Sequence, residues 1–143
     1  MHLQLHDSAP MPASRGQCQA IDLIDKISLI EAHWQPRVVA EMNNYQFKVV
    51  KLKGDFVWHV HSETDETFVV LEGELRIDVR QEPHGNDSSI LLRPGQMAVI
   101  PQGMEHRPCA PSEVKLLLIE PRGVVNTGDH APSERTVPND LWV

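Results

Sequence analysis

The chain has 143 residues with 13 basic and 20 acidic side chains, which give a net charge of −7. This length favours a single domain, and the acidic balance argues against a nucleic-acid partner, which would require a basic patch. No apolar run approaches the roughly 18 residues that cross a bilayer, and residues 1–10 lack the basic and apolar regions of a signal peptide. We therefore expect one cytoplasmic domain with no nucleic-acid or membrane partner.

The first 35 residues predict an arm followed by a short helix. Residues 1–20 contain Pro, Ser and Gly without any periodicity, which is typical of an arm or loop. Apolar residues then recur at helical spacing between positions 21 and 34; they are Leu23, Ile27, Ile30 and Trp34. Asp22 is suited to cap the start of this helix, and Pro36 should end it by restricting the residue before it.

The remainder of the chain predicts short strands separated by turns. Turn residues such as Asn43-Asn44 and Gly73 punctuate apolar or alternating segments. We expect strands over residues 37–42, 45–53, 56–61, 66–72, 74–80, 89–92, 97–100, 106–110 and 114–120. This spacing of strands and turns predicts an all-β sandwich or barrel. Residues 122–143 are polar and rich in Gly and Pro, and predict an extended tail.

The segment WHVHSETDETFVVLEG, residues 58–73, carries two histidines two positions apart and a carboxylate soon after. On a strand, His59 and His61 would point to the same face, so their imidazoles could converge on one ion at about 2.1 Å. Two carboxylates compete for a third ligand position. Glu63 continues the alternation from His61, but residues 62–65 predict a turn that breaks it, which favours Glu66 at the start of the next strand.

A second segment, GQMAVIPQGMEH, spans residues 95–106 and ends in His106. Taken alone, His106 is as well explained by a packed core histidine as by a ligand. Together, the two segments resemble the two motifs of the cupin family. The first motif corresponds here to Gly54, His59, His61, Glu66 and Gly73, and the second to Gly95, Pro101, Gly103 and His106.

The chain departs from the cupin motifs at two positions. Gly54 lies one residue closer to His59 than is usual, and Ala110 stands where the second motif ends in Asn. The segments IEPRG, residues 119–123, and Asn-Thr-Gly, residues 126–128, also resemble a group of small single-domain bacterial cupins. Some members of that group carry names borrowed from sugar-phosphate isomerases.

The cupin resemblance implies a double-stranded β-helix, or jelly-roll barrel, over residues 36–121. The arm and helix of residues 1–35 would precede it, and the tail of residues 122–143 would pack on or near it. The resemblance also implies one divalent transition metal ion, Fe, Mn, Ni, Zn or Cu, held by His59, His61, Glu66 and His106. A homodimer is expected from the habit of the family and from open sheet edges, with the arm and residues 37–42 as candidate contacts.

Two functional hypotheses follow from this resemblance. The first is a metal-dependent enzyme that acts on a small oxygenated molecule in the barrel, with sugar-isomerase-like chemistry placed slightly ahead of dioxygenation. The second is a non-catalytic module that senses or stores a small ligand; a purely structural interaction module would leave the ligand set unexplained. An enzyme needs a further polar or titratable group near its substrate, and the sequence names no such catalytic residue.

Overall fold

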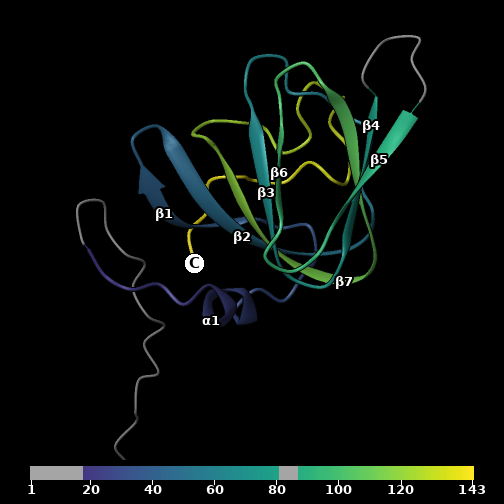
Figure 1. Cartoon of the computed structure of the whole chain (residues 1–143). Coiled ribbons are helices and arrows are strands. Elements are labelled where there is room, and N and C mark those ends of the chain that lie inside the picture. Colours follow the sequence, from purple (N-terminus) through teal and green to yellow (C-terminus); the bar gives the residue numbers. More distant parts are fainter. Residues whose placement is uncertain (1–17, 81–86) are drawn as a thin grey trace, which may run out of the picture.

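The structure is a computed structural model, and it describes residues 18–80 and 87–143. The arm predicted over residues 1–20 therefore lies almost entirely outside the described residues. The described chain forms α1 (Leu23–Ser28), β1 (Arg37–Met42), β2 (Tyr45–Asp55), β3 (Glu66–Glu72), β4 (Leu75–Arg80), β5 (Asp87–Leu92), β6 (Met97–Ile100) and β7 (Glu105–Pro121). Figure 1 shows these strands wrapped around a common interior. The predicted all-β barrel with a short N-terminal helix is confirmed.

The strands pair antiparallel around the longest of them, β7. The C-terminal half of β7 lies between β2 and β3, and its N-terminal half pairs with β4, which in turn pairs with β5. The sequence predicts two strands here, over residues 106–110 and 114–120, and that prediction is wrong. A register shift opposite residues 52–54 of β2 accommodates residues 111–113, so one extended strand runs through the whole region.

Helix α1 is shorter than the sequence predicts. Asp22 caps its start as expected, because its carboxylate accepts from a first-turn amide at 2.9 Å. The helix ends at Ser28 rather than near Pro36. Trp34 adopts a positive φ of 62° and donates its backbone N–H to the Lys51 carbonyl at 2.8 Å. A left-handed residue held in this way cannot belong to a continuing helix.

The segment that carries the first two histidines is not the strand predicted over residues 56–61. Gly54 has a φ of 88°, a conformation that glycine adopts readily, and β2 ends directly afterwards at Asp55. Beyond that point an isolated bridge joins His59 to His106 through backbone hydrogen bonds of 3.0 and 2.9 Å. The segment therefore passes β7 as a loop, and the bridge fixes the position of His59.

Apolar side chains fill the interior of the barrel. The largest cluster combines aromatic rings with Val, Leu and Ile side chains from most strands, and includes Trp34, Phe56, Phe68, Val70, Leu75, Ile77 and Leu116. A second cluster lies between α1 and the outer side of β1 and β2, and consists of Ile27, Ile30, Val39 and Val49. Each such side chain contributes about 1.5–3 kcal/mol when it is removed from water, so α1 is held on the outside of the barrel by packing.

The C-terminal residues return along β1, the first strand of the sheet. Val38 accepts from the Val143 amide at 3.1 Å and donates its own N–H to the Leu141 carbonyl at 2.7 Å. These bonds cover part of an otherwise open edge. The division into residues 1–35, 36–121 and 122–143 stays a prediction. Within the described ranges, no helix is long and apolar enough to cross a membrane.

Candidate metal centre

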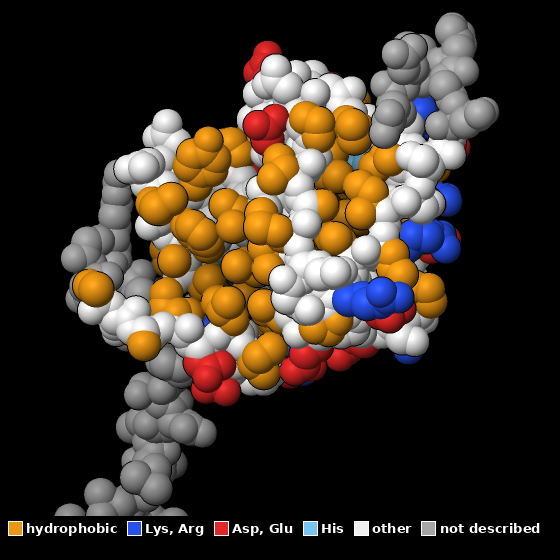
Figure 2. Space-filling model, viewed as in Figure 1, with side chains coloured by type: hydrophobic (Ala, Val, Ile, Leu, Met, Phe, Trp, Pro, Cys, Tyr) orange, Lys and Arg blue, Asp and Glu red, His pale blue; other side chains and the backbone are white. Residues whose placement is uncertain are grey.

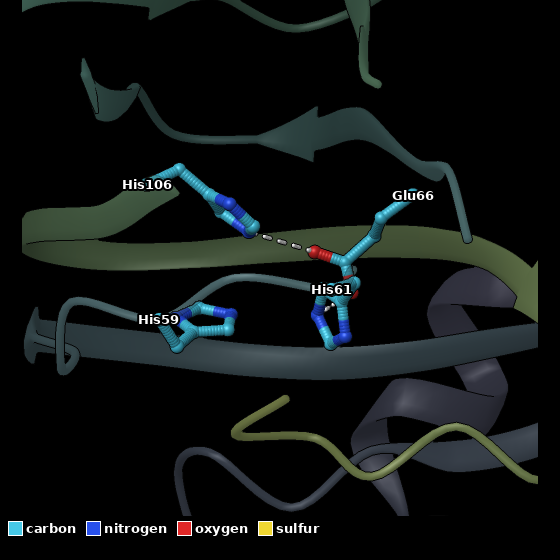
Figure 3. Close-up of side chains that lie close together, drawn as sticks. All are labelled: His59, His61, Glu66 and His106. Atoms are coloured by element: carbon cyan, nitrogen blue, oxygen red, sulfur yellow. Dashed lines mark ion pairs between the residues drawn. The ribbon is translucent and has the colours of Figure 1, made fainter. Parts of the chain in front are cut away.

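The four side chains predicted as metal ligands converge inside the barrel (Figure 3) and are called the histidine cluster here: His59, His61, Glu66 and His106. The first two come from the loop after β2, the third from the start of β3 and the fourth from the start of β7. Their donor atoms lie within 4.8 Å of one another. Donors bound to one ion at about 2.1 Å are at most about 4.2 Å apart, so small side-chain shifts would bring the set around an ion.

Backbone contacts bring the three histidines to one place. The bridge between His59 and His106 holds their ring centroids 4.3 Å apart. The His61 carbonyl accepts from the Gly103 amide at 2.8 Å, and Gly103 has a φ of 79° in the turn before β7. The turn of the second sequence motif therefore positions the loop of the first motif as well as its own histidine.

Carbonyl groups orient two of the imidazole rings. Nδ1 of His59 lies 2.9 Å from the Val57 carbonyl oxygen, and Nδ1 of His106 lies 2.9 Å from that of Met104. When Nδ1 carries the proton and donates to the carbonyl, Nε2 keeps its lone pair. Among the described residues, the buried Nε2 atoms of His61 and His106 have no hydrogen-bond partner. A metal ion is the natural partner for buried lone pairs of this kind.

The charge states of the cluster suit a cation. Glu66 oxygens lie 3.4 Å from Nε2 of His61 and of His106. Burial raises the pKa of Glu66, but its interactions with His106 and His61 outweigh burial and hold that pKa well below its usual value. Burial and the neighbouring His106 lower the pKa of His59 to about 4, whereas Glu66 raises the pKa of His61 against the effect of burial. Metal binding requires ionised carboxylate and neutral imidazole, which the pKa shifts of Glu66 and His59 favour, whereas His61 would release its proton when an ion binds.

One of the two competing carboxylates lies in the cluster. Glu66 is 6 % exposed and faces the histidines, whereas Glu63 is exposed in the turn before β3. Cys109 lies apart from the cluster, with its Sγ 3.6 Å from the Asp78 carboxylate. Trp58 packs against an arginine guanidinium, 4.2 Å from the centre of its ring system. These contacts place the side chains of Cys109 and Trp58 outside the histidine cluster.

The C-terminal tail closes over the loop that carries His59 and His61. The Asp129 amide donates to the Val60 carbonyl at 2.9 Å. A Cβ atom added at Gly128 would lie 2.2 Å from the same carbonyl oxygen, and Gly128 has a φ of 54°. Only glycine fits this close approach without displacing the loop. The Asn-Thr-Gly segment noted in the sequence therefore supports the histidine cluster from outside.

A second polar cluster, which sequence reasoning missed, lies on the same interior wall. This lysine cluster consists of Lys48, Glu120 and Asn139: Glu120 Oε1 accepts from Lys48 Nζ at 2.7 Å and from Asn139 Nδ2 at 2.8 Å. Lys48 is fully buried and Glu120 is 1 % exposed. Lys48 and Glu120 could have been located from the alternation of side chains along a strand, because each lies on the same face of its strand as the inward apolar residues.

Glu66 and Glu120 are neighbours on adjacent strands. Glu66 precedes Thr67, Glu120 follows Ile119, and Thr67 and Ile119 are paired across the antiparallel strands. Glu66 and Glu120 therefore lie opposite each other, and both side chains point into the barrel. Burial and then the nearby Glu66 charge raise the pKa of Glu120 to about 7, and Lys48 acts in the opposite direction. Two buried carboxylates cannot both stay ionised without enough positive charge nearby, so this wall favours a cation in addition to Lys48.

A mostly apolar cavity adjoins both clusters. Its walls include His59, Glu66, Glu120, Asn126 and Asn139, and the rings of Trp34, Phe56 and Phe68 with Val and Leu side chains of β2 and β7. The rings of Trp34 and Phe56 are stacked, with centroids 4.8 Å apart. The cavity volume of about 40 Å³ is several times the roughly 10–15 Å³ that holds one water molecule and well below the roughly 150 Å³ of an engineered cavity that binds benzene. The cavity therefore holds a few water-sized groups as it stands, and a ring compound would enter only if the apolar walls moved apart.

Comparison with known families agrees with the motifs and the barrel. Residues 47–120, just over half of the chain, match the family model described as a cupin domain. The chain is a cupin. The matched region contains the whole histidine cluster and both charged members of the lysine cluster, Lys48 and Glu120, so the resemblance drawn from the two sequence motifs is confirmed.

This cupin is similar to proteins of known structure and to one curated bacterial protein. A cupin-2 domain protein from Shewanella frigidimarina is 53% identical, with a TM-score of 0.66 over 71% of this chain and 94% of that one. The uncharacterized protein YdbB of Bacillus subtilis is 33% identical over 69 residues, which span 48% of this chain and only 57% of YdbB. Hydroquinone 1,2-dioxygenase PnpCD in complex with Fe³⁺ has a TM-score of 0.66 at 21% identity, over 81% of this chain and 37% of that one. The last likeness shows the fold alone.

Proposed function

We propose that this cupin is a metal-dependent enzyme that acts on a small oxygenated molecule. The observation that carries the proposal is the histidine cluster, a buried set of three imidazoles and one carboxylate at the wall of a cavity, in which Nε2 of His61 and of His106 makes no hydrogen bond to the described residues. One divalent transition metal ion held there would supply Lewis-acid chemistry to a bound oxygen atom. The proposed ligands are His59, His61, Glu66 and His106.

The donor set narrows the metal to borderline transition ions. Imidazole with one carboxylate suits Fe, Mn, Ni, Zn or Cu, and disfavours the hard ions Mg and Ca, which prefer oxygen ligands throughout. Glu66 supplies one negative charge, and the lysine cluster is close to neutral because Lys48 pairs with Glu120. A divalent ion would therefore leave a local charge near +1, which favours an anionic or polarised oxygen of the substrate.

The cavity walls favour an apolar body over a sugar. A sugar derivative carries hydroxyl groups on all sides, and each hydroxyl that faces Trp34, Phe56 or Phe68 would lose its hydrogen bonds to water. A small ring compound with one or two hydroxyl groups would meet these rings without that cost. We therefore place dioxygen-dependent oxidation of such a compound ahead of sugar isomerisation. The iron-bound hydroquinone dioxygenase of the same fold is consistent with this order as an analogy.

Oxygen uptake tests the proposed reaction. Protein loaded with Fe(II) would be mixed with a panel of small phenols and, separately, with sugar phosphates, in the cell of an oxygen electrode. We expect uptake with one or more phenols, loss of uptake in Glu66→Gln, and retention in Glu63→Gln, which changes an exposed carboxylate outside the cluster. Interconversion of a sugar phosphate without oxygen uptake would support an isomerase instead. Tight binding without turnover by any metal form would support the sensing or storage module.

We also propose that the protein forms a homodimer through the outer face of the sheet. Met97 and Val99 of β6, the last strand of the sheet path, are 57% and 51% exposed. Figure 2 shows hydrophobic side chains gathered over the face that carries β1, β2, β3 and β6. A second copy would cover this apolar face. Light scattering should give about twice the chain mass of 16.1 kDa, and Met97→Glu with Val99→Glu should halve it, whereas Leu91→Glu on β5 should not.

A further inference from the structure

The carboxylate of Glu120 has one satisfied and one unsatisfied oxygen inside the cavity. Oε1 accepts from Lys48 and Asn139, as described above, whereas Oε2 meets no N–H or O–H donor among the described residues; the neighbouring Glu66 is itself a carboxylate and can bond to Glu120 only through a shared proton. Glu120 is 1 % exposed and its side chain lines the cavity. A buried carboxylate oxygen without a donor carries a large desolvation cost. A ligand that brings a donor into the cavity would remove this cost.

Glu120 is placed beside the proposed metal site without belonging to it. The donor atoms that lie within 4.8 Å of one another come from the histidine cluster and do not include Glu120. Its neighbour Glu66 points into the same space from the adjacent strand. An ion bound by Glu66 would draw that carboxylate to itself and leave Glu120 Oε2 facing whatever occupies the cavity.

We propose that Glu120 is a ligand-binding residue whose Oε2 accepts a hydrogen bond from a hydroxyl group of the bound molecule. The inference rests on the proposed metal function, since a different oxygen of the same molecule would occupy the metal. It defines the ligand as a small ring compound with two oxygen substituents, at least one of which keeps its O–H. The apolar rings of Trp34, Phe56 and Phe68 line the cavity and would enclose its body after moving apart to enlarge it.

Lys48 and Asn139 act as positioning residues for Glu120. They approach Oε1 from β2 and from the C-terminal tail, and both present N–H donors to it. This arrangement fixes which oxygen faces the cavity. It also fixes the orientation of a glutamine at position 120, because the amide oxygen would face the two donors and the amide NH₂ would face the cavity. Glu120→Gln therefore converts the cavity-facing acceptor into a donor with little change in shape.

Matched ligand pairs test this assignment without any catalytic turnover. The probes are the three benzenediols and the corresponding monomethyl ethers, each titrated by calorimetry into zinc-loaded protein under nitrogen. Each ether keeps the ring and one free hydroxyl but loses one O–H donor. We expect at least one diol to bind about tenfold or more tightly than its ether, because a buried acceptor rejects the analogue that lacks the donor. In Glu120→Gln this preference should vanish or reverse, because the amide NH₂ can donate to the ether oxygen.

The controls separate this inference from the proposed metal site. Glu113→Gln removes an exposed carboxylate beside His33 and should keep the wild-type preference. Lys48→Met with Glu120→Met removes the acceptor without leaving Lys48 charged and unpaired. This double variant should lose the preference, and it serves as the test if the single variant folds poorly. Zinc content is measured first, and protein without zinc would contradict the metal site. Zinc-loaded protein with equal diol and ether affinities, or a preference unchanged in both Glu120 variants, would overturn the role of Glu120.

Discussion

Two buried polar clusters lie in the same barrel and differ in the source of their compensating charge. The lysine cluster contains its own cation, with Lys48 Nζ 2.7 Å from Glu120 Oε1. The histidine cluster contains a carboxylate and imidazole nitrogens that meet only that carboxylate, at 3.4 Å, and its four members supply no permanent cation. Folding therefore supplies the cation of the lysine cluster, while the histidine cluster receives its cation only from an added ion. Variants in the first should change stability directly, and variants in the second should change the response to metal.

The largest change in the free energy of unfolding is expected when the ion pair of the lysine cluster is broken. Lys48→Met would leave Glu120 buried with one neutral donor, Asn139, in place of an ion pair. Removal of one partner from a buried ion pair typically costs about 3–5 kcal/mol. Urea unfolding of metal-free protein should show a loss of this size. Lys48→Met combined with Glu120→Gln should recover most of it, and equal losses in the single and double variants would contradict the pairing.

A smaller change in the free energy of unfolding is expected when a metal ion binds the histidine cluster. Zinc at 100 times its dissociation constant should add about 2.7 kcal/mol to the free energy of unfolding, which corresponds to a rise of roughly 5–10 °C in Tm for a domain of this size. Differential scanning fluorimetry of wild-type protein checks the shift. His59→Ala with His61→Ala should show none, whereas Glu63→Gln should keep it. An equal shift in the double histidine variant would place the zinc elsewhere.

The smallest change in the free energy of unfolding is expected for Asp78, whose arginine partners on the outer side of the barrel are partly exposed to water. Asp78 accepts from Arg107 at 2.9 Å, from Arg76 at 3.0 Å and from Ser89 at 2.8 Å. Although burial raises the pKa of Asp78, these hydrogen bonds outweigh burial and lower it to about 2 from its ordinary 3.8. Asp78→Asn should cost about 1–2 kcal/mol, since the arginines are partly exposed.

The pH dependence of that cost follows from the direction of the shift. The folded protein keeps Asp78 ionised at a pH where the unfolded chain already binds a proton. Its contribution is therefore complete above pH 4 and lost as pH falls from about 4 to about 2. Unfolding curves of wild-type protein and Asp78→Asn should converge over this range. A difference that stays constant down to pH 2 would show that Asp78 acts through packing alone.

The two interior clusters also differ in how far the sequence reveals them. The histidine cluster is encoded by local spacing within residues 58–73 and 95–106, so a motif finds it although the predicted strand over residues 56–61 does not exist. The lysine cluster joins positions 48, 120 and 139, and the lysine and glutamate are 72 residues apart. Its members meet only through strand pairing and the return of the tail. The alternation of side chains along each strand places Lys48 and Glu120 inward, but only the register between β2 and β7 brings them together.

The elements of the fold also divide into those encoded by local sequence and those that depend on contacts between distant residues. Strand existence and the bounds of β1, β3 and β6 were predictable, because alternation and turn residues act over a few positions. Three elements required tertiary contacts. Trp34 ends the helical region through its bond to Lys51, Gly54 directs the chain away from the β2 ladder, and residues 111–113 stay extended opposite a register shift. Gly54 has a local signal, because glycine is a turn residue, whereas the Trp34–Lys51 bond and the register shift have none.

Metal content is the measurement that tests the central claim most directly. Protein purified without chelator or added metal, and analysed by mass spectrometry of the elements, should carry one divalent transition metal ion per chain. His59→Ala with His61→Ala should carry none while it keeps the circular dichroism spectrum of the wild type. Wild-type protein that takes up no transition metal, even from a solution of Fe, Mn, Ni, Zn and Cu ions, would contradict the account, as would stoichiometric metal in the double variant.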